Sequence, residues 1–218
     1  MKLRGKYLIV AACFAVTNAD SALVVATQAV AAKSNYTSIT EKHCRKFDRV
    51  KVNGSEFAAS RICEGRGGYK VVIREDDLRE TLTIGKTLKQ AAEEPAASDH
   101  YEAFNYYDDT VEWRSGADRK PYAVIVGWSY ADNENSDANG RPKSLRLLVV
   151  LRLPPGAVCK VAYVDRAANE DANELARKAA DEIAPNFKCG ADAVQIVGAH
   201  GRAIEAMAPA ADGAKTAK

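Results

Sequence analysis

The side chains best suited to chemistry lie in one acidic and aromatic stretch. Residues 88–118 carry two basic and eight acidic residues, a net charge of −6. Rings interleave with these acids; rings give rigid contact area, and acids attract a basic partner or a cation. The predicted binding surface consists of Asp99, His100, Tyr101, Glu102, Tyr106, Tyr107, Asp108, Asp109 and Trp113. The alternative is that half of the rings are core and that the acids only solvate a loop.

The same stretch contains a carboxylate–histidine pair that could perform acid–base chemistry. Asp99 precedes His100, and Asp108 and Asp109 follow soon after. An envelope hydrolase would need these groups to converge in one cleft. The sequence has no GxSxG elbow, and a free cysteine nucleophile is lost if the cysteines form disulfides. We therefore favour a polar loop histidine and predict no catalytic residue.

A second polar stretch, residues 135–140, matches the first half of a calcium loop. Oxygen ligands would fall at alternate positions, with Gly140 at the sharp turn. The twelfth position is Arg146, where an EF-hand needs a glutamate, and both flanks are strand-like. A solvated hairpin loop is the favoured interpretation, and calcium binding is left open. No metal site and no cofactor is predicted.

Cysteine spacing predicts two disulfides. Cys13 lies in the N-terminal segment, and the other four cysteines allow three pairings. The dipeptide 53–54 (Asn-Gly) is a strong signal for a two-residue hairpin turn. That turn places Cys44 opposite Cys63, which leaves Cys159 to pair with Cys189. No CxxC spacing is present, so zinc is disfavoured.

The proposed hairpin register has one unfavourable feature. It opposes Lys46 with Arg61, and like charges directly across a sheet repel. A bulge that shifts the register is therefore an alternative.

The N-terminal segment has the pattern of an export signal. Basic residues precede a nine-residue apolar run, residues 8–16, which is too short to span a bilayer. Small residues follow, and cleavage is predicted after Ala19, Ala22 or Ala32, with residues 1–32 as the signal peptide. A lipoprotein with a lipidated Cys13 and an uncleaved anchor are the alternatives. We predict a periplasmic or secreted bacterial protein without a membrane span after cleavage.

Composition excludes several classes of protein. The chain has 218 residues and a mass of 23.5 kDa, with 47% apolar and 28% charged residues. These values exclude a disordered chain and a multi-pass membrane protein. The net charge is +2, and residues 33–218 carry 28 basic and 28 acidic residues. This balance gives no reason to expect nucleic acid as a partner.

Hydrophobic periodicity predicts a β-rich chain that must position these side chains. Strand-like segments are 69–74, 81–84, 111–114, 122–130, 145–153, 159–164 and 194–197. One helix is expected from an Asn169 cap to residue 183, with a stripe of alanines facing a sheet. The predicted fold is α+β: a disulfide-pinned hairpin lobe packed with a larger antiparallel sheet that carries this helix. The predicted units are 33–86 (hairpin lobe), 87–98 (linker or short helix), 99–204 (α+β lobe) and 205–218 (disordered tail).

The order of several structural residues carries a family resemblance. These residues are Tyr36-Thr37-Ser38-Ile39, Cys44, Cys63, Gly65, Gly68-Tyr69, Val71, Asp77-Leu78-Arg79, Val111-Glu112-Trp113-Arg114 and the strand 122–128. In this order the chain resembles the small exported proteins of unassigned function from rhizobia-like alphaproteobacteria, over about half its length. The resemblance implies a bacterial periplasm and supplies no catalytic or ligand residue.

These observations favour a non-enzymatic binding or inhibitor-type module whose partner is an envelope protein or a glycan. A structural or stress-related envelope component is the alternative, followed by the envelope hydrolase.

Overall fold

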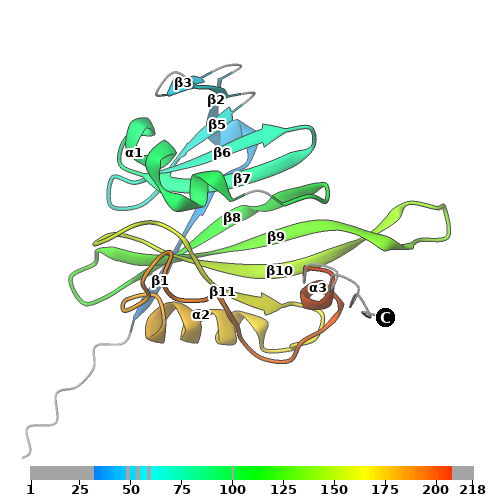
Figure 1. Cartoon of the computed structure of the whole chain (residues 1–218). Coiled ribbons are helices and arrows are strands. Elements are labelled where there is room, and N and C mark those ends of the chain that lie inside the picture. Colours follow the sequence, from blue (N-terminus) through cyan, green and yellow to red (C-terminus); the bar gives the residue numbers. More distant parts are fainter. Residues whose placement is uncertain (1–31, 48–49, 53–54, 58–59, 100, 208–218) are drawn as a thin grey trace, which may run out of the picture.

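The computed structural model describes residues 32–47, 50–52, 55–57, 60–99 and 101–207 (Figure 1). The strands are β1 (Lys33–Ser38), β2 (Cys44–Phe47), β3 (Val50–Val52), β4 (Ser55–Phe57), β5 (Ser60–Glu64), β6 (Lys70–Asp76), β7 (Arg79–Gly85), β8 (Asn105–Ser115), β9 (Pro121–Ser136), β10 (Pro142–Arg152), β11 (Lys160–Asp165) and β12 (Gln195–Ile196). The helices are α1 (Leu88–Glu93), α2 (Ala172–Glu182) and α3 (Arg202–Glu205), with the 3₁₀ turns η1 (Glu41–His43) and η2 (Pro95–Ser98).

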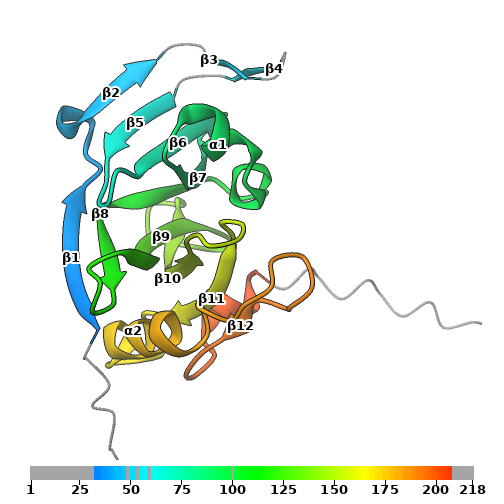
Figure 2. The same cartoon turned by 90° about the vertical axis from the view of Figure 1, so that its left-hand side faces the viewer.

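Ten of these strands form one large sheet. Its order is β12-β11-β10-β9-β8-β7-β6-β5-β2, and β1 pairs with β8. Figure 2 shows the strands following one another round a curve, with β1 along its side and α2 near β11. Most pairs are antiparallel, whereas β7–β8 and β11–β12 are parallel. The β-rich α+β class predicted from the sequence is confirmed.

The alternating strands bury two apolar faces. Along β10, Leu147, Val149 and Leu151 enter the main core, while Leu148 and Val150 face the opposite side. On that opposite side the alanine stripe of α2 packs on the sheet, as its helical spacing predicts. Alanine side chains are short, so this helix lies close to the strands.

The predicted N-terminal cap of α2 is wrong. The helix begins at Ala172, and the Asn169 side chain bonds elsewhere. Its Nδ2 donates to the Asp165 and Ala199 carbonyls at 2.9 and 3.0 Å, and its Oδ1 accepts from Ala199 N–H at 2.8 Å. Asn169 therefore ties two distant loops together, a partner choice that local sequence does not reveal.

Both predicted disulfides are present. Cys44–Cys63 joins β2 to β5, and these two residues are directly opposite each other. Cys159–Cys189 joins the residue before β11 to the loop between α2 and β12. Residues 53–54, the predicted turn, lie outside the described residues. The flanking strands keep the expected register, in which Val50 pairs with Phe57.

The like-charged pair in this hairpin needs no bulge. Lys46 is directly opposite Arg61. Each charge has its own carboxylate: Lys46 pairs with Glu41 and Arg61 pairs with Glu80, both at 2.6 Å. The described counter-charges therefore come from the preceding turn η1, through Glu41, and from β7, through Glu80.

The segment expected to be a linker or short helix contains α1 and η2. Thr87 caps α1 by accepting the Gln90 N–H at 3.1 Å. Core residues from both sides of this segment share one cluster, among them Val71, Leu82, Trp128 and Leu147. No helix of the described residues has the length and apolar character needed to cross a membrane. The predicted signal, residues 1–32, lies almost wholly outside the described residues.

Candidate functional site

The best candidate site is a groove where β8 begins. Within the described chain, β8 pairs with β9 only from Asn105 and Tyr130 onward, whereas β9 continues to Ser136. Figure 1 shows the β9–β10 hairpin projecting beyond the rest of the sheet, on the same side as the β6–β7 turn. On the other flank of β8, Asn105 N–H donates to the Leu78 carbonyl at 3.0 Å. A gap is therefore left between the β6–β7 turn and the β9–β10 arm.

This gap is an open groove of about 380 Å³, which we call the aromatic groove. Its lining comprises Glu75, Leu78, Glu80, Phe104, Asn105, Tyr106, Tyr130, Ala131, Pro142, Lys143 and Ser144. The volume falls within the range of small-ligand sites. Leu78, Phe104 and Tyr106 are 60%, 48% and 50% exposed, so the groove presents apolar surface to solvent.

Leu78 is held in an unusual backbone conformation. It has φ +61° and follows Asp77 at φ +47°, in the tight turn between β6 and β7. Left-handed backbone costs a non-glycine residue roughly 1–2 kcal/mol because Cβ approaches a carbonyl. A strained, exposed leucine contributes little to its own fold, which makes this position a candidate for function.

Arg79 fixes the turn to the floor of the groove. Its Nη1 donates to the Asp77 carboxylate at 2.6 Å, and its Nε donates to the Glu102 carbonyl at 2.7 Å. The same guanidinium lies 5.0 Å from the centre of the Phe104 ring. One cation therefore orders both the turn and the aromatic segment before any ligand arrives.

Buried Asn105 supports the groove from beneath. Its Oδ1 accepts the Trp128 Nε1–H at 3.0 Å and the Glu80 N–H at 3.2 Å. Its Nδ2 donates to the Ala103 carbonyl at 3.0 Å. This side chain links β7, β9 and the segment before β8 through three hydrogen bonds.

The rim of the groove is unevenly charged. Glu80 pairs with Arg61 and also accepts the Tyr107 N–H at 2.8 Å. Glu75 and Glu102 are exposed, and neither has an ion-pair partner in the described part of the chain. Lys143 is the exposed cation among the lining residues. Glu75 thus brings a carboxylate without an ion pair to the wall formed by the β6–β7 turn, and Glu102 lies two residues before Phe104 in the chain.

The structure separates the residues of the predicted binding surface. Tyr106 lines the groove, and Glu102 lies beside it. Tyr107 and Trp113 are buried in the core, and Tyr101 packs against that core. This burial follows from strand alternation: Tyr106 and Tyr107 are neighbours, so they point to opposite faces.

The acidic residues of the predicted surface are also dispersed. Asp99 pairs with buried Lys160 at 2.9 Å, and that ammonium lies 5.0 Å from the Trp128 ring centre on the main-core face. Asp108 pairs with Arg166 at 2.8 Å. Asp109 lines a separate hollow of about 230 Å³ together with Asp108. His100, the base of the hydrolase hypothesis, lies outside the described residues.

The hollow beside Asp108 arises from a bulge in β8. Tyr107 pairs with Trp128 and Val111 pairs with Val126, so residues 108–110 oppose only Gly127. A Cβ at Gly127 would collide with the Asp108 side chain, so a larger residue there would force that carboxylate to move. Bulges often re-aim side chains next to functional sites.

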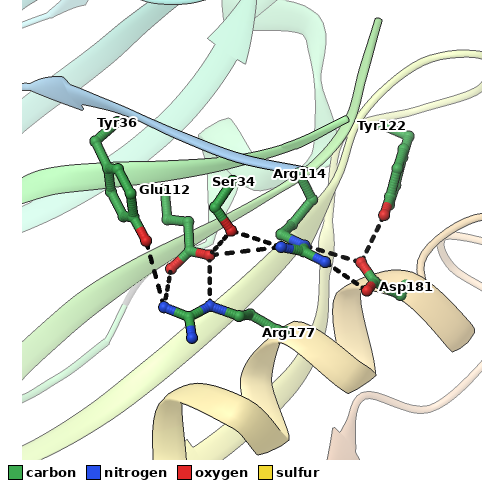
Figure 3. A network of polar contacts seen from close by, with 7 residues as sticks. All are labelled: Ser34, Tyr36, Glu112, Arg114, Tyr122, Arg177 and Asp181. Atoms are coloured by element: carbon green, nitrogen blue, oxygen red, sulfur yellow. Dashed lines mark hydrogen bonds and ion pairs between the residues drawn. The ribbon is translucent and has the colours of Figure 1, made fainter. Parts of the chain in front are cut away.

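A polar network next to this hollow attaches α2 and β1 to β8 (Figure 3). Arg114 is almost fully buried and binds Asp181 of α2 through two contacts, at 2.9 and 2.6 Å. Arg177 Nε donates to Glu112 at 2.8 Å. Ser34 of β1 bridges the two halves, because it donates to Glu112 and accepts from Arg114.

The ionisation of this network favours its present hydrogen bonds. Burial, with the Asp181 contact as a second cause, raises the pKa of Tyr122 to about 12, so its hydroxyl stays a donor. The bond to Asp181 raises the pKa of Arg114, and the bond to Glu112 raises that of Arg177. The network joins α2 and β1 to β8.

The calcium-like loop is the tip of the β9–β10 arm. Asp137 Oδ1 accepts the Asn139 and Arg141 N–H groups at 2.8 and 3.0 Å. The described residues contain no group of three or more His, Cys, Asp or Glu that could hold a metal ion.

Of the residues that line the groove, only Tyr106 belonged to the predicted site. Phe104 lies within the acidic aromatic stretch, so its composition was a usable signal. Leu78 gave no signal, because a leucine does not indicate a left-handed turn.

Comparison of the chain with protein-family models, with curated proteins and with solved structures found no match.

Proposed function

We propose that the protein is an exported, non-enzymatic binding module and that the aromatic groove is its binding site. The observation that carries this proposal is the gathering of exposed apolar side chains. Of the five large apolar side chains that are exposed among the described residues, Leu78, Phe104 and Tyr106 line this groove. Contiguous exposed apolar surface with a polar rim is typical of interaction sites.

Two features support a site of action outside the cytoplasm. Residues 1–32 have the basic, apolar and small-residue pattern of an export signal. Two disulfides join distant segments, and such bonds persist in oxidising compartments. We therefore place the partner, a protein or a glycan, in the bacterial cell envelope.

The test is capture of envelope components by matched variants. Wild-type protein with both disulfides formed, a Phe104→Ser/Tyr106→Ser variant and a Val194→Ser control are immobilised and exposed to envelope extract. Val194 is exposed but does not line the groove. Retention by wild type and control, with loss in the groove variant, is expected. Equal retention by all three, or none, would overturn the groove as the binding site and favour a structural envelope component.

A further inference from the structure

We propose that the aromatic groove binds an extended peptide segment of another protein by strand addition to β9. Apolar side chains of the peptide would pack on Phe104 and Tyr106, and its basic side chains would lie near Glu75 and Glu102. This inference rests on the proposed function and names the class of partner.

The first argument is an open strand edge. Ala131 N–H donates to the Phe104 carbonyl at 2.9 Å, so its backbone groups point toward β8. No strand of the described chain pairs with β9 on this side beyond Tyr130. Asn133 opposes no residue of β10, because the β9–β10 register shifts between the Asp132–Lys143 and Ser136–Pro142 pairs, and no described strand pairs with it on the β8 side. An unpaired edge of this kind is a template for another strand.

The second argument is the shape of the space beside that edge. The β6–β7 turn flanks one side of the start of β8, and the β9–β10 arm flanks the other. Leu78 and Ala131 both contact the start of β8 through backbone hydrogen bonds, to Asn105 N–H and the Phe104 carbonyl. The gap between them therefore lies where β8 would continue, which is the width of a single strand.

The third argument is the side-chain chemistry of the walls. Half-exposed Phe104 and Tyr106 offer apolar contact for every second residue of a strand. The Arg79 contacts hold this surface in place, so little conformational freedom is lost on binding. Glycan recognition also uses aromatic rings, but it makes no use of an open strand edge.

The fourth argument is charge. Glu75, a lining carboxylate without an ion-pair partner in the described part of the chain, selects a basic peptide on the turn side of the groove, and exposed Glu102 adds negative charge to the segment before Phe104. Lys143 lies on the opposite wall. Glu75→Gln should therefore weaken binding of a basic peptide, and Lys143→Gln should leave it unchanged or strengthen it.

The experiment begins with a phage-displayed library of random dodecapeptides. The library is selected on wild-type protein with both disulfides formed, and in parallel on the Phe104→Ser/Tyr106→Ser variant. We expect wild type to enrich peptides with alternating apolar residues and Lys or Arg, depleted in Asp and Glu. Lack of enrichment over the groove variant would overturn the proposal.

A backbone test separates strand addition from other modes of binding. An enriched peptide is synthesised in three forms: unmodified, N-methylated at its odd-numbered amides, and N-methylated at its even-numbered amides. The affinity of each form for the protein is measured by fluorescence polarisation. One of the two methylated forms should bind at least tenfold more weakly than the unmodified peptide, because its methyl groups replace the N–H hydrogens that face β9. Asn133→Pro should weaken binding similarly, and Val194→Ser should not.

The outcomes distinguish this inference from the function on which it rests. Peptide binding of equal strength in all three forms would overturn strand addition. Groove-dependent capture from envelope extract without peptide enrichment would overturn the peptide and leave the binding module, with a glycan as occupant. Failure of both experiments would overturn both proposals.

Discussion

At the scale of single residues, the groove is built from side chains that do little for the fold. Leu78 is exposed in a left-handed turn, whereas Asn105 is buried and its side chain makes three hydrogen bonds. Arg79 connects the β6–β7 turn to the floor of the groove, since it contacts Asp77 in the turn and Phe104 in the floor. Apolar side chains held by an ordered backbone lose little conformational freedom when a ligand binds, which favours binding.

The first prediction concerns Leu78. Leu78→Asn should raise the free energy of unfolding by about 1 kcal/mol, because asparagine tolerates left-handed backbone better than leucine. Urea denaturation measures the change. Arg119→Asn is the matched control, since Arg119 also has φ +61° but does not line the groove. Both variants should gain stability, and only Leu78→Asn should lose binding. A loss of stability in Leu78→Asn would mean that this leucine supports the fold.

At the scale of elements, the polar network of Figure 3 sets how α2 sits on the sheet. Alanine side chains give α2 a close but small apolar contact. The Arg114–Asp181 pair supplies a directional contact beside it, and Asp181 is about one-third exposed whereas Arg114 is buried.

The second prediction is a coupling between these two residues. Asp181→Ala should lower the free energy of unfolding by about 2–3 kcal/mol, because buried Arg114 loses its two closest carboxylate contacts and keeps, among the described residues, only Ser34 and Glu112, the latter at 3.9 Å. Arg114→Met should have a similar effect, and the double variant should cost less than the sum of both. Urea denaturation of the four proteins gives the coupling energy. Additive effects would show that the pair does not dock α2.

The third prediction concerns pH and α3. Arg202 binds buried Asp132 at 2.9 and 2.7 Å and holds the pKa of that carboxyl well below its usual range. Since the unfolded pKa is about 3.9, this contribution to stability is complete above about pH 4 and is lost as the pH falls through the folded pKa.

The free energy of unfolding, measured in urea from pH 5 to pH 2, should therefore fall with acidification. Asp132→Asn should flatten this fall, and Glu75→Gln, at an exposed carboxylate without an ion pair, should not. An unchanged slope in Asp132→Asn would contradict the role of this pair.

Local patterns predicted those elements whose partners are close in sequence. The Cys44–Cys63 hairpin follows from its turn signal and pairing, and the β10 alternation follows from period two. The length of β8 was underestimated as 111–114, because the bulge at 108–110 interrupts the alternation. The groove depends on where β8 begins relative to β7 and β9, and pairing between distant strands leaves no signal in a single segment.

At the scale of the whole molecule, the strands before and after residues 87–98 belong to one sheet, although this segment was expected to separate two lobes. The direct pairing of β7 with β8 is a single position, Arg79 with Asn105. The main core nevertheless joins both halves, since Cys63 and Ile73 share a cluster with Val126 and Leu151. Backbone pairing also joins the halves, because β1 pairs with β8 from Lys33–Ser115 to Ser38–Thr110. Shared apolar burial and the β1–β8 ladder therefore both couple the two halves.

The fourth prediction follows from this shared core: the two halves should unfold together. Urea denaturation should give coincident transitions by tryptophan fluorescence and far-UV circular dichroism, because Trp113 and Trp128 lie in the shared cluster and the strands extend across both halves. Leu82→Ala, in the first half, and Leu147→Ala, in the second, should each shift both transitions by the same amount. The cost of each should be about 2–5 kcal/mol, since both side chains are fully buried.

Two separate transitions, each moved by only one substitution, would instead support independent lobes. Because the groove takes its walls from both halves, separate lobes would also mean that its width changes as they move.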